Sequence, residues 1–361
     1  MLYNDFQGMK LSALGLGCMR FPTIDGADGA IDEDATAGMV EYAMSQGINY
    51  YDTAWFYHSG SSETVMGRIL KKYPRDSFYL ATKMPGSFRE EGKTPGDIFE
   101  KQLEKCQVTY FDFYLFHNVC ENNIDDFTND DIGVYRYLME QKRSGRIRHL
   151  GFSTHGSLST IRRFLEKYGK DMEFCQIQLN YLDWNLQNAK AKVELLNQYG
   201  IPIWVMEPVR GGRLVNLPQE DIAALDALRP GVGTPEWAFR FLQSIPGVTM
   251  VLSGMSNEAQ LQENIRTFSQ SKPLDRQEWD TLMEIADRII RKNAVPCTGC
   301  SYCVDHCPQS IPIPDIIKLY NDGGKPTALG PKDCLGCRSC ESMCPQGIMI
   351  SEVMAKFAEK L

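Results

Sequence analysis

The chain has 361 residues, of which 43% are hydrophobic and 23% are charged, so it is long enough to bury a sizeable core in about two domains. Its formal net charge of −8 opposes binding to the phosphate backbone of nucleic acids. No segment approaches the roughly 18 apolar residues of a membrane span. We therefore expect neither nucleic acid nor a membrane as a partner.

Through about residue 270, short β-rich runs alternate with helical patterns such as those at 41–47, 63–73 and 98–106. Most of the β-rich runs are apolar throughout, as expected for strands buried on both faces. They lie at 11–18, 49–53, 78–83, 111–117, 147–153, 174–180, 201–206 and 248–253. Eight strand–helix units predict an α/β fold of the (β/α)8 TIM barrel type. A doubly wound sheet is the rival, but no G-x-G-x-x-G motif follows any strand.

A further amphipathic helix is predicted after the eighth unit, over 276–291. Pro273 and Pro296 lie on either side of it. Because proline interrupts a helix, these two residues mark its limits. We therefore expect a barrel domain at 1–292 and a smaller domain at 293–361.

Four ionisable residues of different kinds lie at the carboxyl ends of strands two to four. Asp52 and Tyr57 come at the end of strand two, Lys83 ends strand three and His117 ends strand four. Each has an ordinary alternative role, such as a helix cap for Asp52 or a core histidine for His117. All four are expected at the carboxyl end of the barrel strands, which is the end that carries the catalytic groups in this fold. This shared position favours an active site over the ordinary roles.

Residues 1 to about 290 resemble the aldo-keto reductase family. The resemblance rests on Asp52-x4-Tyr57, Lys83 and His117, which occur in this order and at these strand positions. The resemblance implies reduction of a small carbonyl compound by NADPH or NADH, or oxidation of an alcohol in reverse. A carbonyl that accepts hydride becomes an alkoxide and needs a proton at that moment. Tyr57 would donate it, with its pKa lowered by Lys83. Asp52 would orient Lys83, and His117 would position or polarise the carbonyl.

The same resemblance assigns contacts with the nicotinamide cofactor. Ser153 and Gln176 match residues that hold the nicotinamide carboxamide, and Thr154 stands where the family often has Asn. Asn264 matches a contact with the adenine. These four residues are therefore expected to bind the cofactor.

Four further positions carry a departure from the family pattern or an open role. Glu207 occupies the place of an aromatic ring that stacks on the nicotinamide in many relatives. Gly254 and Gln260 stand where NADPH-preferring members often carry Lys and Arg for the 2′-phosphate, so NADH is a fair contender. Arg210 is assigned either to a cofactor phosphate or to a salt bridge at the rim of the barrel.

Eight of the twelve cysteines form two copies of one spacing near the C-terminus. They are Cys297, Cys300, Cys303 and Cys307, then Cys334, Cys337, Cys340 and Cys344. A proline follows each quartet. This C-x2-C-x2-C-x3-C-P spacing is that of a bacterial ferredoxin with two [4Fe–4S] clusters.

In such a domain the fourth cysteine of each run crosses to the other cluster. Cluster one would take Cys297, Cys300, Cys303 and Cys344, and cluster two would take Cys334, Cys337, Cys340 and Cys307. Zinc favours two separated C-x2-C pairs rather than two quartets, and a disulfide knot is the other alternative. Thiolate-bound clusters also favour a reducing cytoplasm.

Hydride moves two electrons together, whereas a [4Fe–4S] cluster passes one electron at a time. A flavin bound at the barrel's phosphate site would link two-electron transfer to one-electron transfer, but no flavin-binding motif in the sequence supports it. The leading interpretation is an aldo-keto-reductase-like oxidoreductase that exchanges electrons with a redox partner protein or an unseen cofactor. A second keeps the enzyme, with nicotinamide doing all the chemistry, and makes the clusters structural or a redox sensor. The alternative is an electron-transfer protein or redox sensor, with the barrel as a scaffold and the clusters as structural or docking elements.

Overall fold

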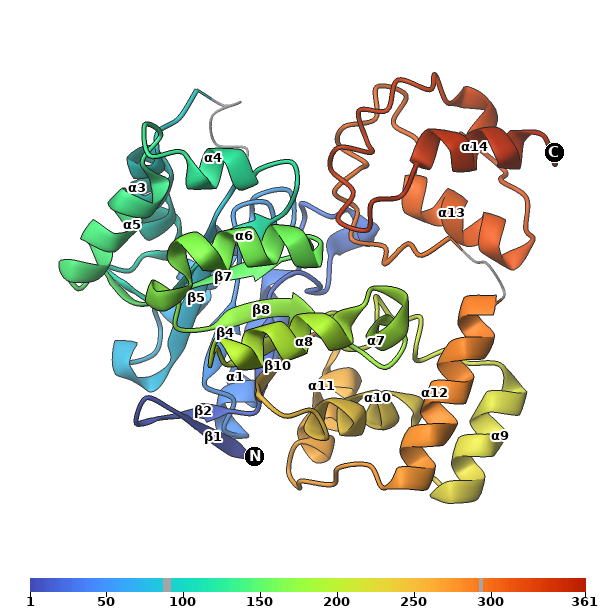
Figure 1. Cartoon of the computed structure of the whole chain (residues 1–361), viewed down its shortest axis with the longest axis horizontal. Coiled ribbons are helices and arrows are strands. Elements are labelled where there is room, and N and C mark those ends of the chain that lie inside the picture. The colour runs from blue at the N-terminus through green and yellow to red at the C-terminus, as the bar shows by residue number, and fades with distance from the viewer. Residues whose placement is uncertain (87–91, 292–294) are drawn as a thin grey trace. The chain divides into compact units, whose positions relative to one another are not determined.

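Eight parallel strands close into a barrel, which confirms the predicted (β/α)8 fold (Figure 1). The computed structural model describes residues 1–86, 92–291 and 295–361. The order around the barrel is β10-β3-β4-β5-β6-β7-β8-β9. The strands are β3 (Leu14–Gly17), β4 (Tyr50–Asp52), β5 (Tyr79–Met84), β6 (Phe111–Val119), β7 (Ile147–Thr154), β8 (Cys175–Gln178), β9 (Ile203–Met206) and β10 (Val248–Gly254).

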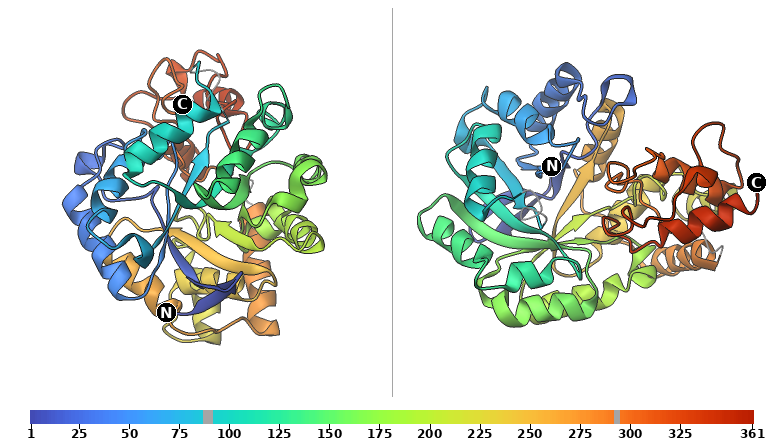
Figure 2. Two further views of the ribbon diagram at one scale, coloured as in Figure 1. Left: turned by 90° about the vertical axis from the view of Figure 1, so that its left-hand side faces the viewer. Right: turned by 90° about the horizontal axis from the view of Figure 1, so that it is seen from above.

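Helices lie outside the strands of this barrel, as two further views show (Figure 2). In chain order, the helices that begin before residue 270 are α1 (Glu33–Ser45), α2 (Ser62–Leu70), α3 (Pro95–Cys106), α4 (Ile124–Thr128), α5 (Val134–Arg143), α6 (Leu158–Tyr168), α7 (Asp183–Leu186), α8 (Ala189–Gln198), α9 (Gln219–Leu228), α10 (Thr234–Gln243) and α11 (Glu258–Thr267), of which α9 belongs to the second unit described below. Among the described residues, no helix is long and apolar enough to cross a membrane.

Polar side chains fix several of these helix starts. The carboxylate of Asp32 accepts the Ala35 N–H at the start of α1. Thr94 and Asp97 form a reciprocal capping box at the start of α3, where Pro95 takes the first helical position. Such caps satisfy the backbone N–H groups that a first turn leaves without partners. They explain why α1 begins at Glu33, well before the apolar pattern that sequence alone shows.

The register of the strands brings the predicted catalytic positions to one face. Asp52 on β4 pairs with Ala81 on β5, and Lys83 on β5 pairs with Leu115 on β6. Paired residues on neighbouring strands share a face, and so do residues two apart along one strand. Ala81 and Leu115 belong to the core inside the barrel. The side chains of Asp52, Lys83 and His117 therefore point into the barrel. All three residues lie towards the carboxyl ends of their strands.

A two-stranded hairpin precedes the barrel, where the sequence predicted a single strand at 11–18. It consists of β1 (Tyr3–Phe6) and β2 (Met9–Ser12), and only β3 enters the barrel. The linking residues Gln7 and Gly8 have φ of 51° and 85°. Two successive positive φ angles are those of a tight hairpin turn.

Phe6 from this hairpin packs into the core inside the barrel. Its ring lies 5.1 Å from that of Trp204 and 5.7 Å from that of Phe113, centroid to centroid. The hairpin thus supplies apolar contacts to the interior of the barrel. The predicted catalytic residues lie at the opposite, carboxyl ends of the strands.

The chain divides into two compact units. The first comprises Met1–Pro208 and Pro235–Arg276, and the second comprises Val209–Thr234 and Gln277–Leu361. The second unit contains α9, α12 (Arg276–Arg291) apart from its first residue, α13 (Ile313–Asp322) and α14 (Ile350–Ala358). The predicted boundary between 292 and 293 falls on residues 292–294, outside the described residues, so it stays a prediction.

Two ion pairs join α12 to the segment Val209–Thr234 within the second unit. Arg229 donates two hydrogen bonds to the buried carboxylate of Glu278. Arg288 donates to the buried carboxylate of Asp221, with Nη2 to Oδ1 at 2.6 Å. Buried carboxylates need such partners, because an unpaired buried charge is costly. These ion pairs therefore attach the segment Val209–Thr234, which follows β9 in the sequence, to the unit that carries the cysteine quartets.

The cysteine-rich part of the second unit has a small core of its own. Ile313, Ile316 and Ile317 of α13 pack with Ile350 and Met354. The helices α13 and α14 lie side by side (Figure 1), with the rings of Tyr320 and Phe357 5.3 Å apart. This apolar layer supports the loops that carry the cysteines.

Candidate active site and cluster sites

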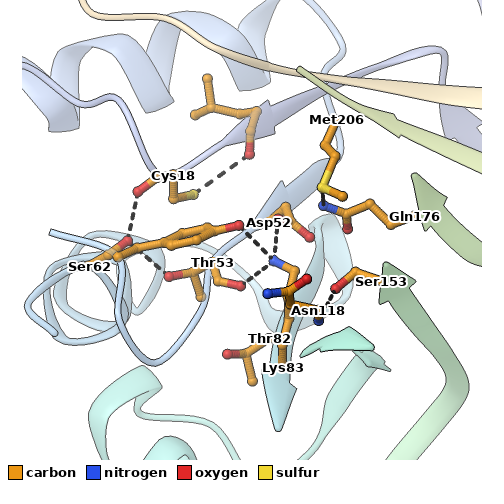
Figure 3. A network of polar contacts seen from close by, with 12 residues as sticks. Cys18, Asp52, Thr53, Ser62, Thr82, Lys83, Asn118, Ser153, Gln176 and Met206 are labelled. Carbon is orange, nitrogen blue, oxygen red and sulfur yellow. Dashed lines mark hydrogen bonds and ion pairs between the residues drawn. The ribbon is translucent and has the colours of Figure 1, made fainter. Parts of the chain in front are cut away.

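Lys83 is the centre of a buried polar cluster at the ends of β4 and β5 (Figure 3). Its Nζ donates to Oδ1 of Asp52 at 2.5 Å and to the carbonyl oxygen of Thr53 at 2.8 Å. The hydroxyl of Tyr57 lies 3.3 Å from the same Nζ. Lys83 is fully buried, so its charge is stabilised by these oxygens rather than by water.

His117 approaches Tyr57 from the end of β6. The two rings meet edge to face, with centroids 6.1 Å apart. Both side chains are buried. The structure therefore brings together all four residues of the predicted catalytic set, and a substrate oxygen between Tyr57 and His117 would meet groups from both.

The protonation of Tyr57 differs from the sequence-based expectation. We expected Lys83 to lower its pKa, but burial raises the pKa of Tyr57 well above its usual value, and the Asp52 carboxylate raises it further. The charge of Lys83 is already shared with Asp52 and Thr53. Tyr57 is therefore a neutral phenol with its proton available to a stronger base.

His117 is also neutral around pH 7. Burial lowers the pKa of His117 well below its usual value, and the charge of Lys83 lowers it further. A neutral imidazole keeps one N–H donor and one acceptor nitrogen. His117 can therefore donate a hydrogen bond to a carbonyl oxygen without carrying a charge.

A second buried network, which the sequence analysis did not predict, anchors the strand that carries Lys83. Oε1 of Glu63 accepts from the Thr82 hydroxyl at 2.6 Å and from Nε2 of Gln102 at 2.7 Å. The same Nε2 lies 2.9 Å from the carbonyl oxygen of Lys83, and Lys105 pairs with Glu63 at 3.2 Å. Helices α2 and α3 thus fix the backbone of β5 directly beneath the reactive side chains.

The ends of β6, β7 and β8 carry a second group of polar atoms (Figure 3). The N–H of Asn118 donates to Oγ of Ser153 at 2.8 Å, and Nε2 of Gln176 lies 3.7 Å from Sδ of Met206. Ser153 and Gln176 are register partners on neighbouring strands. The two residues predicted to hold the carboxamide are therefore adjacent.

Two buried amide oxygens in this group are acceptors with no hydrogen-bond partner among the described residues. They are Oδ1 of Asn118 and Oε1 of Gln176. Buried polar atoms normally have partners, so such atoms are candidates for ligand contacts. A carboxamide NH2 has two donors, so either acceptor has the chemistry to receive a hydrogen bond from a nicotinamide amide.

Asn118 is a candidate contact that the sequence did not indicate, whereas Thr154 is already engaged. The Thr154 hydroxyl donates to the carbonyl oxygen of Val119 at 2.6 Å and accepts from the Gly156 N–H. Asn118 has φ of 55°, a left-handed backbone that Asn tolerates better than most residues. In the sequence, the only signal for a cofactor contact at Asn118 was that this residue directly follows His117.

The predicted adenine and phosphate positions lie at the end of β10 and on α11. Asn264 donates to Oγ of Ser253 at 3.1 Å. Gln260 lies in the first turn of α11 and accepts from the Ser256 N–H at 2.8 Å. A Cβ added to Gly254 would lie 2.7 Å from Cγ of Arg20. Arg20 thus takes up space beside the position where relatives carry lysine.

Glu207 and Arg210 follow β9 and both have a left-handed backbone, with φ of 57° and 52°. The carbonyl oxygen of Glu207 accepts from Nδ2 of Asn180 at 2.9 Å. Arg210 belongs to the second unit, where its buried guanidinium donates to Oε1 of Gln346 at 3.4 Å. Its assignment to a cofactor phosphate stays a prediction.

The eight cysteines of the two quartets surround two separate cavities in the second unit. The first cavity is lined by Cys297, Cys300, Cys303 and Cys344. The second cavity is lined by Cys334, Cys337, Cys340 and Cys307. These are the crossed sets expected for two clusters, so the residues present fit the two groups.

No disulfide joins any of the twelve cysteines, all of which lie in the described part of the chain. Within those described ranges, no three Cys, His, Asp or Glu residues are arranged to hold a single metal ion. In a cubane cluster each thiolate binds a different iron, so the sulfurs need not converge on one point. The crossed lining of the two cavities is the observation that supports clusters.

A closed (β/α)8 barrel joined to this cysteine framework defines a barrel enzyme with an iron–sulfur module. The family model "Aldo/keto reductase family" matches residues 13–287, and "4Fe-4S dicluster domain" matches residues 296–349. The first match covers more than half of the chain. The chain belongs to the aldo/keto reductase family of oxidoreductases and carries a C-terminal 4Fe-4S dicluster domain.

Individual relatives agree with this assignment. "Probable aldo-keto reductase 1" of Glycine max is 28% identical over 218 residues, which cover 57% of this chain and 58% of that protein. "L-galactose dehydrogenase" of Arabidopsis thaliana is 23% identical over 299 residues, 77% of this chain and 90% of that one. The holo form of aldo-keto reductase AKR11C1 from Bacillus halodurans has the same fold, with a TM-score of 0.63, 24% identity and coverage of 77% and 93%.

Proposed function

We propose that this protein is an NAD(P)H-linked oxidoreductase that interconverts a small carbonyl compound and an alcohol. We propose further that it exchanges single electrons through two [4Fe–4S] clusters, in a reducing cytoplasm. The observation that carries the first part is the buried cluster of Lys83, Asp52 and Tyr57, with His117 at the edge of the Tyr57 ring.

In this proposal Tyr57 is the proton donor. Its raised pKa keeps the phenol protonated, and an alkoxide formed on the substrate is a stronger base than a phenolate. Lys83 holds the Tyr57 hydroxyl at 3.3 Å and stabilises the phenolate left after transfer. Asp52 fixes Lys83, and neutral His117 orients the carbonyl oxygen through an N–H donor.

The nicotinamide cofactor, when bound, supplies the hydride. Asn118, Ser153 and Gln176 would hold its carboxamide, and the two buried acceptor oxygens support this role. Asn264 and Gln260 would face the adenosine end. The absence of lysine and arginine at 254 and 260 favours NADH. A relative in Escherichia coli named "NADH-specific methylglyoxal reductase", 26% identical over 223 residues, is consistent with that choice.

For the clusters, the crossed lining of the two cavities supports one set of four thiolates each. A cluster accepts one electron, so a redox partner protein that delivers single electrons is the expected partner of this unit. Acid-labile sulfide and iron near eight of each per chain would support two clusters, because each cubane contains four of each.

The test of the carbonyl chemistry is Tyr57→Phe, which keeps the ring and removes the proton donor. We expect kcat for reduction of an aldehyde such as 4-nitrobenzaldehyde to fall by about 10² to 10⁴-fold, the usual contribution of a general acid. NADH binding, followed by quenching of its fluorescence, should be unchanged.

Tyr51→Phe is the matched control. Tyr51 is buried on β4, the strand that leads to Tyr57, but its hydroxyl donates to the carbonyl oxygen of Ile48 at 3.2 Å, away from Lys83. This variant should keep the wild-type kcat. Wild-type turnover by Tyr57→Phe, or equal losses in the two variants, would contradict the assignment.

A further inference from the structure

The two cluster sites are near-copies of one local scaffold. Gly299 and Gly336 have φ of 65° and 66°, and each donates its N–H to the first thiol of its own quartet, at 3.4 and 3.5 Å. Ser301 and Arg338 share a left-handed backbone with φ of 65° and 63°. Because the scaffolds match, differences between the clusters depend on what surrounds each site.

The segment Val209–Thr234 touches the first site. Gly211 has φ of 60°, and a Cβ built there would lie 1.9 Å from the carbonyl oxygen of Thr298. Only glycine permits this approach. Thr298 follows Cys297 directly and lines the first cavity together with Gln346. A stretch of chain that begins after β9 is therefore packed against the wall of the first site.

Arg210, the residue before Gly211, brings a buried positive charge to this wall. Its side chain has no exposed surface, and Nη2 donates to Oε1 of Gln346 at 3.4 Å. Gln346 lies two residues after Cys344, a predicted ligand of the first cluster. A guanidinium group is a cation. Only one side chain thus separates this buried cation from the first cavity.

The second site lacks this arrangement in the described residues. Leu335, at the position of Thr298, is 66% exposed, and Gln309, at the position of Gln346, is exposed too. Arg338 lines the second cavity but is exposed to solvent. Water screens an exposed charge far more than a buried one. The field of a cation is therefore stronger at the first site.

We infer that Arg210 raises the reduction potential of the cluster held by Cys297, Cys300, Cys303 and Cys344. The inference rests on the proposed two-cluster content. One-electron reduction of an oxidised cluster with four thiolates changes its net charge from about −2 to about −3, and net charge is a determinant of cluster potential. A nearby cation stabilises the more negative state. Arg210 acts through its charge, across the intervening side chain of Gln346, and is not a ligand of the cluster.

The test is a potentiometric titration of the full-length, anaerobically reconstituted protein with dithionite, followed by electron paramagnetic resonance. Arg210→Gln removes the charge and keeps a hydrogen-bond donor, whereas Arg210→Lys keeps the charge. We expect Arg210→Gln to lower the equilibrium constant for reduction of one cluster at least tenfold, which is about 59 mV for one electron. Arg210→Lys should remain close to wild type.

Lys318→Gln is the matched control, because Lys318 is an exposed cation on α13 in the same unit. It should move neither potential. The affected signal is assigned in a Cys300→Ser background, which removes a ligand of the first cluster only. The inference is overturned if Arg210→Gln shifts neither potential, shifts the second cluster, or shifts the first no more than Arg210→Lys does.

If Arg210→Gln does not retain the first cluster, Gln346→Glu decides. It places a carboxylate beside the guanidinium and should also lower the first potential. Loss of the first cluster in both variants would mean that Arg210 is structural, which overturns the inference. Iron and sulfide well below eight per wild-type chain would instead contradict the two-cluster proposal itself.

Discussion

At the scale of single residues, burial sets the protonation state of Tyr57. In the proposed reaction a protonated tyrosine can give its proton to the alkoxide formed from a carbonyl, whereas in alcohol oxidation it would first have to lose that proton. The sequence indicated the four residues but not this protonation state. Their identities follow from motif and spacing, whereas the pKa depends on burial and on how the charge of Lys83 is shared.

This environment predicts a flat pH profile for carbonyl reduction. The pKa of Tyr57 lies well above 10, so the donor is lost only as the pH rises beyond that value. The pKa of His117 lies well below 6.5, so its protonation matters only at more acidic pH. We expect kcat between pH 6.5 and 9.5 to vary less than twofold, measured by NADH consumption. A clear inflection near pH 6.5 or 8 would contradict these shifts.

Cofactor choice is also a matter of single residues. Gly254 is a poor place for a lysine, because a Cβ there meets Arg20 at 2.7 Å. Gln260→Arg instead adds a cation in the first turn of α11, where a helix N-terminus already favours phosphate. We expect the ratio of kcat/KM for NADPH to that for NADH to rise about tenfold, the value of a charge-assisted hydrogen bond. Gln262→Arg adds the same charge on another face of the helix and should leave the ratio unchanged. An equal rise in the ratio for both variants would contradict a specific phosphate site at Gln260.

At the scale of elements, the eight strands were predictable because buried parallel strands are apolar throughout. Two features were not. The β1–β2 hairpin depends on a two-residue turn inside a short polar stretch. The place of Val209–Thr234 in the second unit depends on long-range contacts such as Arg288 with Asp221. Asn118 was not predicted as a cofactor contact for a related reason, since that proposed role rests on a backbone conformation and on neighbours from other strands.

The network of Glu63 and Gln102 predicts that helices α2 and α3 support catalysis. Gln102→Leu would leave the buried Glu63 carboxylate, the Tyr114 hydroxyl and the Lys83 carbonyl short of partners. Each such group costs about 1–3 kcal/mol. We expect a lower midpoint of urea unfolding, followed by far-ultraviolet circular dichroism, and a reduced kcat. Gln198→Leu, at an exposed position on α8, should change neither, and a wild-type midpoint for Gln102→Leu would contradict the network's role.

At the scale of the whole molecule, the proposed function places two kinds of electron chemistry in one chain. In this proposal the barrel holds the groups for a two-electron carbonyl reduction, and the cysteine framework fits one-electron clusters. The spacing of the quartets predicted the crossed ligand sets, because a motif with fixed local geometry carries its own long-range pairing. In the proposal a redox partner protein delivers the electrons, and local sequence patterns do not encode the identity of such a partner.

The measurement that tests the central claim most directly is the fate of deuterium from NADH labelled at C4 of the nicotinamide ring on the transferred face. If the barrel catalyses direct hydride transfer, the label appears on the carbon of the alcohol product, as mass spectrometry of the product from 4-nitrobenzaldehyde would show. Unlabelled product, with the deuterium lost to water, would mean that electrons reach the carbonyl by another route. That result would contradict the proposed reductase.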